Sequence, residues 1–143
     1  MFIKKTTLFA FFVSFSFVAL LATLPATSSN LQLRQNEIFV AEFTKNEESI
    51  VTGRVTFVAE NPCKVTIKFY EGFTEPEPNN YQFFLNNQDI STQAIQNLII
   101  NPPETYTTEF EIDKTLCEKL DGKPFVIKHK NDQIGKATIV SVE

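Results

Sequence analysis

The sequence predicts an all-β domain, a β-sandwich or flattened barrel of about eight strands. Several segments alternate apolar and polar residues with a period of two, which is typical of strands with one buried and one solvated face. Asn, Asp, Gly and Pro residues separate these segments at short intervals and favour turns. Almost no stretch is long enough for a helix that is stable unaided.

The first 28 residues have the pattern of a secretory signal peptide. Two lysines precede an apolar run from Leu8 to about Ala22, and small residues follow up to Ser28. We expect cleavage after Ser28, which leaves residues 29–143 as a single domain. A signal anchor is the competing interpretation, but the run is short for a membrane span of about 20 residues. We therefore expect a secreted protein, periplasmic if the host is bacterial, with no stable membrane insertion after cleavage.

Charge restricts the partners of the mature domain. The chain has 13 basic and 17 acidic residues, for a formal net charge of −4. Loss of Lys4 and Lys5 with the signal peptide leaves 11 basic residues and a net charge of −6. An acidic surface argues against nucleic acid and anionic lipid as partners. An unidentified extracellular protein is the expected kind of partner.

Two segments near residue 60 predict a β-hairpin. In residues 51–59 the odd positions are apolar or glycine, and the even positions up to Thr56 are polar. After the break at Asn61-Pro62, residues 63–69 alternate in the same way. The next segment, residues 74–80, contains two prolines and no apolar side chain, so we expect an exposed connection there.

The second half of the chain continues with short strands. Pro102-Pro103 ends one apolar run, Asp121-Gly122 is a turn signal, and Asn131-Asp132 predicts the last turn. Residues 115–120 predict a helical turn with Asp113 as its cap. The strands are expected at residues 83–85, 98–100, 106–113, 125–130 and 137–142.

Cys63 and Cys117 are the only cysteines. In a secreted chain two cysteines predict a disulfide, with two buried free thiols as the alternative. Such a bond would close a loop of about 55 residues, which the chain-entropy model values at about 4 kcal/mol.

Residues 122–135, GKPFVIKHKNDQIG, resemble the penultimate strand of the copper/zinc superoxide dismutases, with Lys128 at the position of a copper-binding histidine. The segment 72–75 and the strand after it are similar to the family's Gly-Leu-Thr segment and His-x-His strand. On that alignment Phe84 and Asn86 occupy the two copper-ligand positions. The pattern Val51-x-Gly53-x-Val55-x-Phe57 is similar to the family's second strand.

These pieces follow the family's order from about residue 37 to 142. The resemblance implies an eight-stranded Greek-key barrel, flattened like a sandwich. An immunoglobulin-like sandwich without kinship is the alternative. The family's zinc-ligand loop is nearly absent, since only residues 87–93 fill that place, and its active-site arginine has no counterpart, although Lys136 lies close by. The resemblance therefore implies a scaffold without catalytic residues, metal or cofactor.

The remaining chemistry is sparse. His129, the only histidine, cannot form a copper site alone, and in strand phase it faces away from Lys128. A Cys117–His129 thiol site is disfavoured by oxidation, and Glu109 and Glu111 predict a solvated face. Calcium near Asp113 remains a minor hypothesis, because no EF-hand spacing is present.

Tyr81, Phe83 and Phe84 are candidates for an apolar binding patch, although burial under residues 74–80 is the favoured interpretation. The leading hypothesis is a secreted, metal-free, dismutase-like module for binding or structural support rather than an enzyme. The alternatives are a divergent dismutase with an unusual redox site and a secreted immunoglobulin-like adhesion or inhibitor domain.

Overall fold

A computed structural model describes residues 35–142. From Asn36 onward these residues form one compact unit. The predicted signal peptide and its cleavage point lie outside the described residues, so both stay predictions. The elements are β1 (Glu37–Phe43), β2 (Thr52–Ala59), β3 (Cys63–Glu71), η2 (Pro78–Asn80), β4 (Tyr81–Leu85), β5 (Gln88–Asp89), α2 (Ser91–Ile95), β6 (Ile100–Asn101), β7 (Glu104–Thr105), β8 (Thr108–Ile112), η3 (Lys114–Cys117), β9 (Pro124–His129) and β10 (Asp132–Val142).

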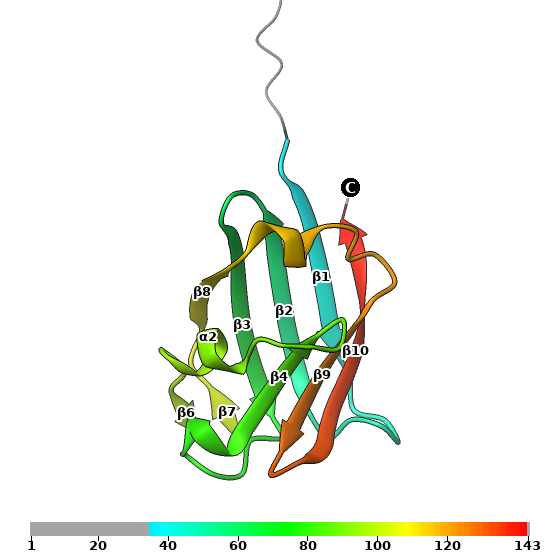
Figure 1. Cartoon of the computed structure of the whole chain (residues 1–143). Helices are drawn as coiled ribbons and strands as arrows, with labels where there is room; N and C mark the ends of the chain where they lie inside the picture. Colours follow the sequence, from blue (N-terminus) through cyan, green and yellow to red (C-terminus); the bar gives the residue numbers. More distant parts are fainter. Residues whose placement is uncertain (1–34, 143) are drawn as a thin grey trace, which may run out of the picture. The chain divides into compact units, whose positions relative to one another are not determined.

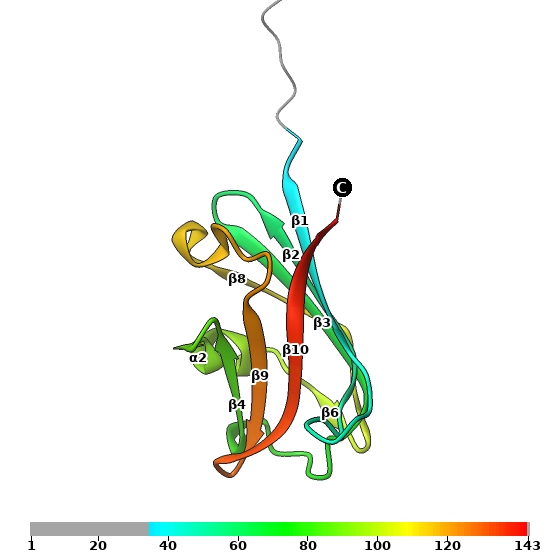
Figure 2. The ribbon, with the colours of Figure 1, turned by 90° about the vertical axis from the view of Figure 1, so that its right-hand side faces the viewer.

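Eight of the strands form one antiparallel sheet in the order β5-β4-β9-β10-β1-β2-β3-β8. The sheet curls on itself, so that β4 and β9 lie in one layer and β1, β2 and β3 in the other (Figures 1 and 2). Strand β3 pairs with β8. The predicted all-β fold, with a main sheet of eight strands, is confirmed.

The hairpin of β2 and β3 forms because both strands bury every second side chain. Val55 pairs with Ile67 and Phe57 with Val65, and all four side chains are buried. Gly53 has φ +149, and a Cβ at this position would overlap the carbonyl oxygen of Lys68. Only glycine therefore allows the two strands to approach so closely here.

Aromatic rings from both layers fill the space inside the curled sheet. Phe69 of β3 stacks on Phe73 with the ring centroids 5.1 Å apart, and Phe43 of β1 meets Phe125 of β9 edge to face. Such pairs add specific geometry to the burial of large apolar surfaces. The core is thus held by the same alternating positions that predict the strands.

Two tight turns set the positions of β4, β9 and β10. Asn86 and Asn87 both have positive φ between β4 and β5, and so do Lys130 and Asn131 between β9 and β10. Two-residue turns of this kind match the twist of the flanking strands. The last turn therefore lies one residue earlier than predicted, and β10 begins at Asp132 instead of residue 137.

Helix α2 lies at the opening of the curled sheet, just before the predicted strand at residues 98–100. It contacts β4 and β8, and its Ala94 is fully buried. The apolar run at 98–100 contributes only the start of a short hairpin, β6 and β7. The sheet therefore stays open between its two edges, with α2 beside β8 (Figure 1).

Candidate functional site

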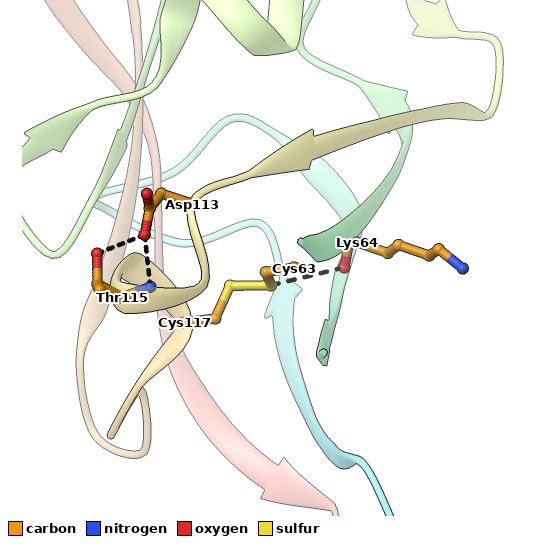
Figure 3. The surroundings of a disulfide bond; sticks show 5 residues. All are labelled: Cys63, Lys64, Asp113, Thr115 and Cys117. Carbon is orange, nitrogen blue, oxygen red and sulfur yellow. Dashed lines mark hydrogen bonds between the residues drawn. A yellow bond between two sulfur atoms is a disulfide. The ribbon is translucent and has the colours of Figure 1, made fainter. Parts of the chain in front are cut away.

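The predicted disulfide joins the start of β3 to the end of η3. Cys63 and Cys117 are bonded, their Cα atoms are 6.3 Å apart, and both side chains are buried. Asp113 accepts hydrogen bonds from the backbone N–H and the hydroxyl of Thr115, as the predicted cap requires (Figure 3). These bonds hold the pKa of Asp113 below its ordinary value. The Cys63 sulfur lies 3.9 Å from the Lys64 carbonyl oxygen. This contact is not a hydrogen bond, because a disulfide sulfur has no hydrogen to donate.

Two of the three residues at the family's ligand positions, Phe84 and Lys128, lie on the outer face of β4 and β9. Phe84 pairs with Val126, and Lys128 pairs with Gln82, two residues along. The Lys128 ammonium lies 5.0 Å from the centroid of the Phe84 ring. Asn86 is exposed in the β4–β5 turn, and its N–H donates to the carbonyl of Pro124 at 2.9 Å. The structure thus brings Phe84 and Lys128 together and leaves Asn86 in a turn.

These residues do not fit a copper ion. Phe84 has no donor atom, and the ammonium of Lys128 is a positive charge with no free lone pair. Copper sites in proteins draw on imidazole, thiolate, thioether and carboxylate groups instead. Within residues 35–142, no three His, Cys, Asp or Glu side chains gather closely enough to hold a metal ion.

His129 faces the opposite side of β9, as its strand phase predicts. Its ring stacks on Tyr81 with the centroids 4.7 Å apart. Its Nε2 lies 3.2 Å from Oε2 of Glu75 but is not aligned with it, and it makes no hydrogen bond to the described residues. His129 therefore contacts the connection formed by residues 74–80 and not the face that carries Lys128.

Glu75 is the centre of a polar cluster that fixes this connection. It accepts hydrogen bonds from Lys130 and Asn80, both at 2.7 Å. The Lys130 hydrogen bond, then the neighbouring His129 ring and the Asn80 amide, lower the pKa of Glu75 from 4.5 to about 2. The Tyr81 hydroxyl accepts from the backbone N–H groups of Thr74 and Glu75, both at 3.0 Å. The cluster holds a loop in place, and its acid stays ionised at neutral pH.

The candidate aromatic patch does not form at the surface. Tyr81 and Phe83 are 1% and 0% exposed, since they point into the core, and only Phe84 points outward. The alternation of β4 carries the signal for this result, because neighbouring residues on a strand face opposite sides. Two of the three residues are therefore core residues, and the 74–80 connection packs beside Tyr81.

The sequence predicts some further surface features and fails to predict others. Glu109 and Glu111 are exposed on the outer face of β8, as predicted. The sequence does not predict an aliphatic strip on the outer face of β1 and β10. In this strip Ile38 pairs with Val142, and both side chains are exposed. Cys117 is bonded to Cys63, so it offers no thiol nucleophile.

Within the described part of the chain, no helix has the length and apolar character needed to cross a bilayer.

Solved structures of superoxide dismutase 5 from Candida albicans have a similar fold. The Cu(II) form is 16% identical to this chain, with a TM-score of 0.53 over 76% of this chain and 94% of that one. Two variant forms, each 16% identical, give TM-scores of 0.54 and 0.55, covering 75% and 76% of this chain and 93% and 91% of theirs. No protein-family model and no curated protein matches the sequence. The resemblance to the dismutases is thus confirmed at the level of the fold.

Proposed function

We propose that this chain is a secreted module that uses a dismutase-like scaffold for binding or structural support and not for catalysis. The contact between Phe84 and Lys128 carries this proposal, because it places a positively charged side chain and an aromatic ring where the family resemblance aligns copper ligands. Neither the scaffold nor the similar solved structures establish an activity by themselves.

Electrostatics support the absence of a copper role at this face. Bringing one positive charge within about 4 Å of an ammonium group costs about 4 kcal/mol at an effective dielectric constant near 20. A divalent copper ion doubles that cost unless Lys128 swings away from the Phe84 ring. Cation and ring, by contrast, attract each other by about 0.5–1 kcal/mol at an exposed site.

Secretion rests on two independent features. The lysines and the apolar run before residue 28 have the signal-peptide pattern. The disulfide between Cys63 and Cys117 suits an oxidising compartment. Expression of the full chain in a secreting host tests this part: we expect mature protein in the medium with Ser29 at its N-terminus. Full-length protein retained in the membrane fraction would support the signal-anchor alternative.

Metal loading tests the non-catalytic part. The mature protein is refolded with copper and zinc, its bound metal is measured by mass spectrometry, and superoxide removal is assayed. We expect less than stoichiometric copper and no turnover above that of free metal. Stoichiometric copper with turnover would refute the proposal in favour of a divergent dismutase.

A variant with restored histidines serves as the matched control. Phe84→His, Asn86→His and Lys128→His together supply imidazoles at the three aligned positions. Copper uptake by this variant, and not by the parent, would show that the scaffold still has the geometry and that the side chains alone explain the difference.

A further inference from the structure

The outer face of β4, β9 and β10 carries two lysines that have no acidic partner. These three strands lie side by side in the sheet (Figure 1). Lys136 of β10 lies opposite Val126 of β9, and Lys128 is two residues further along β9 on the same face. The Cα atoms of such diagonal neighbours are about 7–8 Å apart. Neither ammonium group forms an ion pair with a carboxylate of residues 35–142.

Another pair of neighbouring cations on the sheet shows what these lysines lack. Arg54 of β2 lies opposite Lys68 of β3, also on the outer face. Arg54 pairs with Glu42 of β1, and Lys68 pairs with Glu104 of β7 at 3.3 Å. Each of these two cations thus has its own carboxylate from a neighbouring strand. On β9 and β10 no carboxylate of the described chain has that role, so the two lysines are left for a ligand from outside the domain.

Acidic residues on the neighbouring strands and loop do not neutralise the lysines. Glu42 of β1 is paired with Arg54. Asp89 of β5 accepts a hydrogen bond from the N–H of Ser91 at 2.8 Å. Glu48, in the β1–β2 connection, meets β10 through its carbonyl oxygen, and its carboxylate forms no ion pair among the described residues. The face therefore keeps local positive charge, although the chain as a whole is acidic.

The same face has an apolar centre. Phe84 of β4 lies opposite Val126 of β9, and both side chains are half-buried. The Lys128 ammonium lies 5.0 Å from the centroid of the Phe84 ring, so the charge and the ring are presented together. Protein interfaces have this composition, with aromatic and apolar side chains at the centre and polar or charged side chains at the rim.

Amide groups extend the face at one end. Gln82 lies opposite Lys128 and borders a hollow of about 210 Å³. The other residues that line the hollow carry amide or amino groups and no carboxylate: Asn79, Asn80, Lys130 and Asn131. Groups of this kind donate hydrogen bonds to carboxylate oxygens. The hollow therefore favours the same kind of ligand as the two lysines.

We propose that the outer face of β4, β9 and β10 binds an acidic segment of a partner protein. An apolar side chain of the segment packs on Phe84 and Val126, and carboxylates beside it pair with Lys128 and Lys136. This inference rests on the proposed function and deepens it, because it names the surface and the class of partner of a binding module.

A second copy of this chain suits the face less well. Twofold pairing through the face would bring Lys128 and Lys136 close to the same lysines of the other copy, and opposed like charges destabilise such contacts. Docking on the acidic outer face of β8 of another copy would be head-to-tail, and such contacts form open chains of copies unless the rotation closes a ring. The experiment below detects either arrangement.

The probe is the heptapeptide Ser-Leu-Ser-Glu-Ser-Glu-Ser with blocked ends. When extended, it places its Leu and both Glu side chains on one side. The mature protein, labelled with ¹⁵N and free of metal, is titrated with this peptide, and its amide shifts are followed by NMR. We expect shifts in β9 and in the facing residues of β4 and β10. Peptides with Gln in place of both Glu residues, or with Ser in place of Leu, should bind at least about fivefold more weakly.

Matched variants locate the site. Lys128→Gln with Lys136→Gln should lower the affinity for the Leu-Glu peptide about fivefold, because two charges at the rim are lost. Lys114→Gln with Lys119→Gln removes the same charge from exposed positions around η3 and should leave the affinity unchanged. The NMR spectrum of each variant without peptide reports whether it is folded.

A third variant tests the apolar centre. Phe84→Ala should weaken binding of the Leu-Glu peptide about fivefold, since less apolar surface is buried. The same variant should not change the affinity for the peptide that has Ser in place of Leu. This difference separates packing on the ring from attraction by the lysines.

Four outcomes would overturn the inference. The first is no shift in β9 at millimolar peptide. The second is equal affinity for the Glu and Gln peptides. The third is equal weakening by both pairs of Lys variants, which would mean attraction by total charge. The fourth is a set of shifts that grows with protein concentration without peptide, which would assign the face to a second copy.

The proposed function fails by a different measurement. Stoichiometric copper with turnover in the mature protein would refute it, and that assay contains no peptide. A failed titration without copper uptake would remove the acidic partner and leave the non-catalytic role in place.

Discussion

Removal of the Cys63–Cys117 bond gives the sharpest test of how this small domain is stabilised. The two cysteines are 54 residues apart in sequence and close a large loop between β3 and η3. In the chain-entropy model, a loop of this size lowers the entropy of the unfolded chain by about 14 cal/mol/K, which is about 4 kcal/mol at 25 °C. A domain of this length has a total stability of about 5–15 kcal/mol, so the bond is a large part of it.

The perturbation is the double variant Cys63→Ala with Cys117→Ala, unfolded in urea beside the oxidised parent. With an m-value of about 1.5 kcal/mol/M, a loss of 4 kcal/mol lowers the unfolding midpoint by roughly 3 M. The reduced parent keeps both sulfur atoms and serves as the control that separates the cross-link from packing. We expect it to match the double variant within about 1 kcal/mol, because Ala removes little buried volume.

A loss below about 1 kcal/mol in both the double variant and the reduced parent would refute the entropic reasoning. A large loss in the double variant alone would assign the effect to packing around the two buried sulfur atoms instead of to the closed loop.

Three further predictions concern β2, β4 and the loop before β4. Because the pKa of Glu75 is lowered to about 2, its contribution to stability is present above pH 4.5 and is lost as pH falls from 4.5 toward 2. The Glu75→Gln variant should therefore be less stable than the parent at pH 7, and its stability should change less between pH 4.5 and pH 2 in thermal unfolding scans. An unchanged pH dependence in this range contradicts the reasoning. In urea unfolding, Phe83→Ala should lower the free energy of unfolding by about 3–5 kcal/mol and Phe84→Ala by under about 1 kcal/mol, because only Phe83 is in the core. Similar losses for the two variants would contradict the assignment of their side chains to opposite faces. Gly53→Ala should lower the free energy of unfolding by about 2 kcal/mol or more, since the positive φ of Gly53 and the close Lys68 carbonyl exclude a Cβ. An unchanged stability in calorimetry would contradict this reasoning.

Elements with long, regular alternation could be predicted from the sequence. The β2–β3 hairpin follows from polar Thr52, Arg54 and Thr56 between apolar neighbours, and the outer face of β8 follows from Glu109 and Glu111. Alternation works here because these strands have one buried and one solvated face, and that difference is what the pattern records.

The sequence did not predict α2, because its five residues are too few for a helical pattern, and packing of Ala94 against the core stabilises it. The cluster around Glu75 was also missed. It joins a loop to a turn 55 residues away, and no local pattern reports such a contact. The candidate patch joins Phe83 to Phe84 because the family resemblance aligns Phe84 with a metal ligand, although neighbouring residues on a strand face opposite sides.

The position of β10 has a consequence for biosynthesis. This strand follows every other strand of the sheet along the chain, yet it lies between β9 and β1 and pairs with both. Until β10 has been synthesised, β1 exposes the side where β10 will pair, and the two halves of the sheet have no strand to join them. A truncation before β10 therefore leaves two unjoined half-sheets rather than a smaller stable domain.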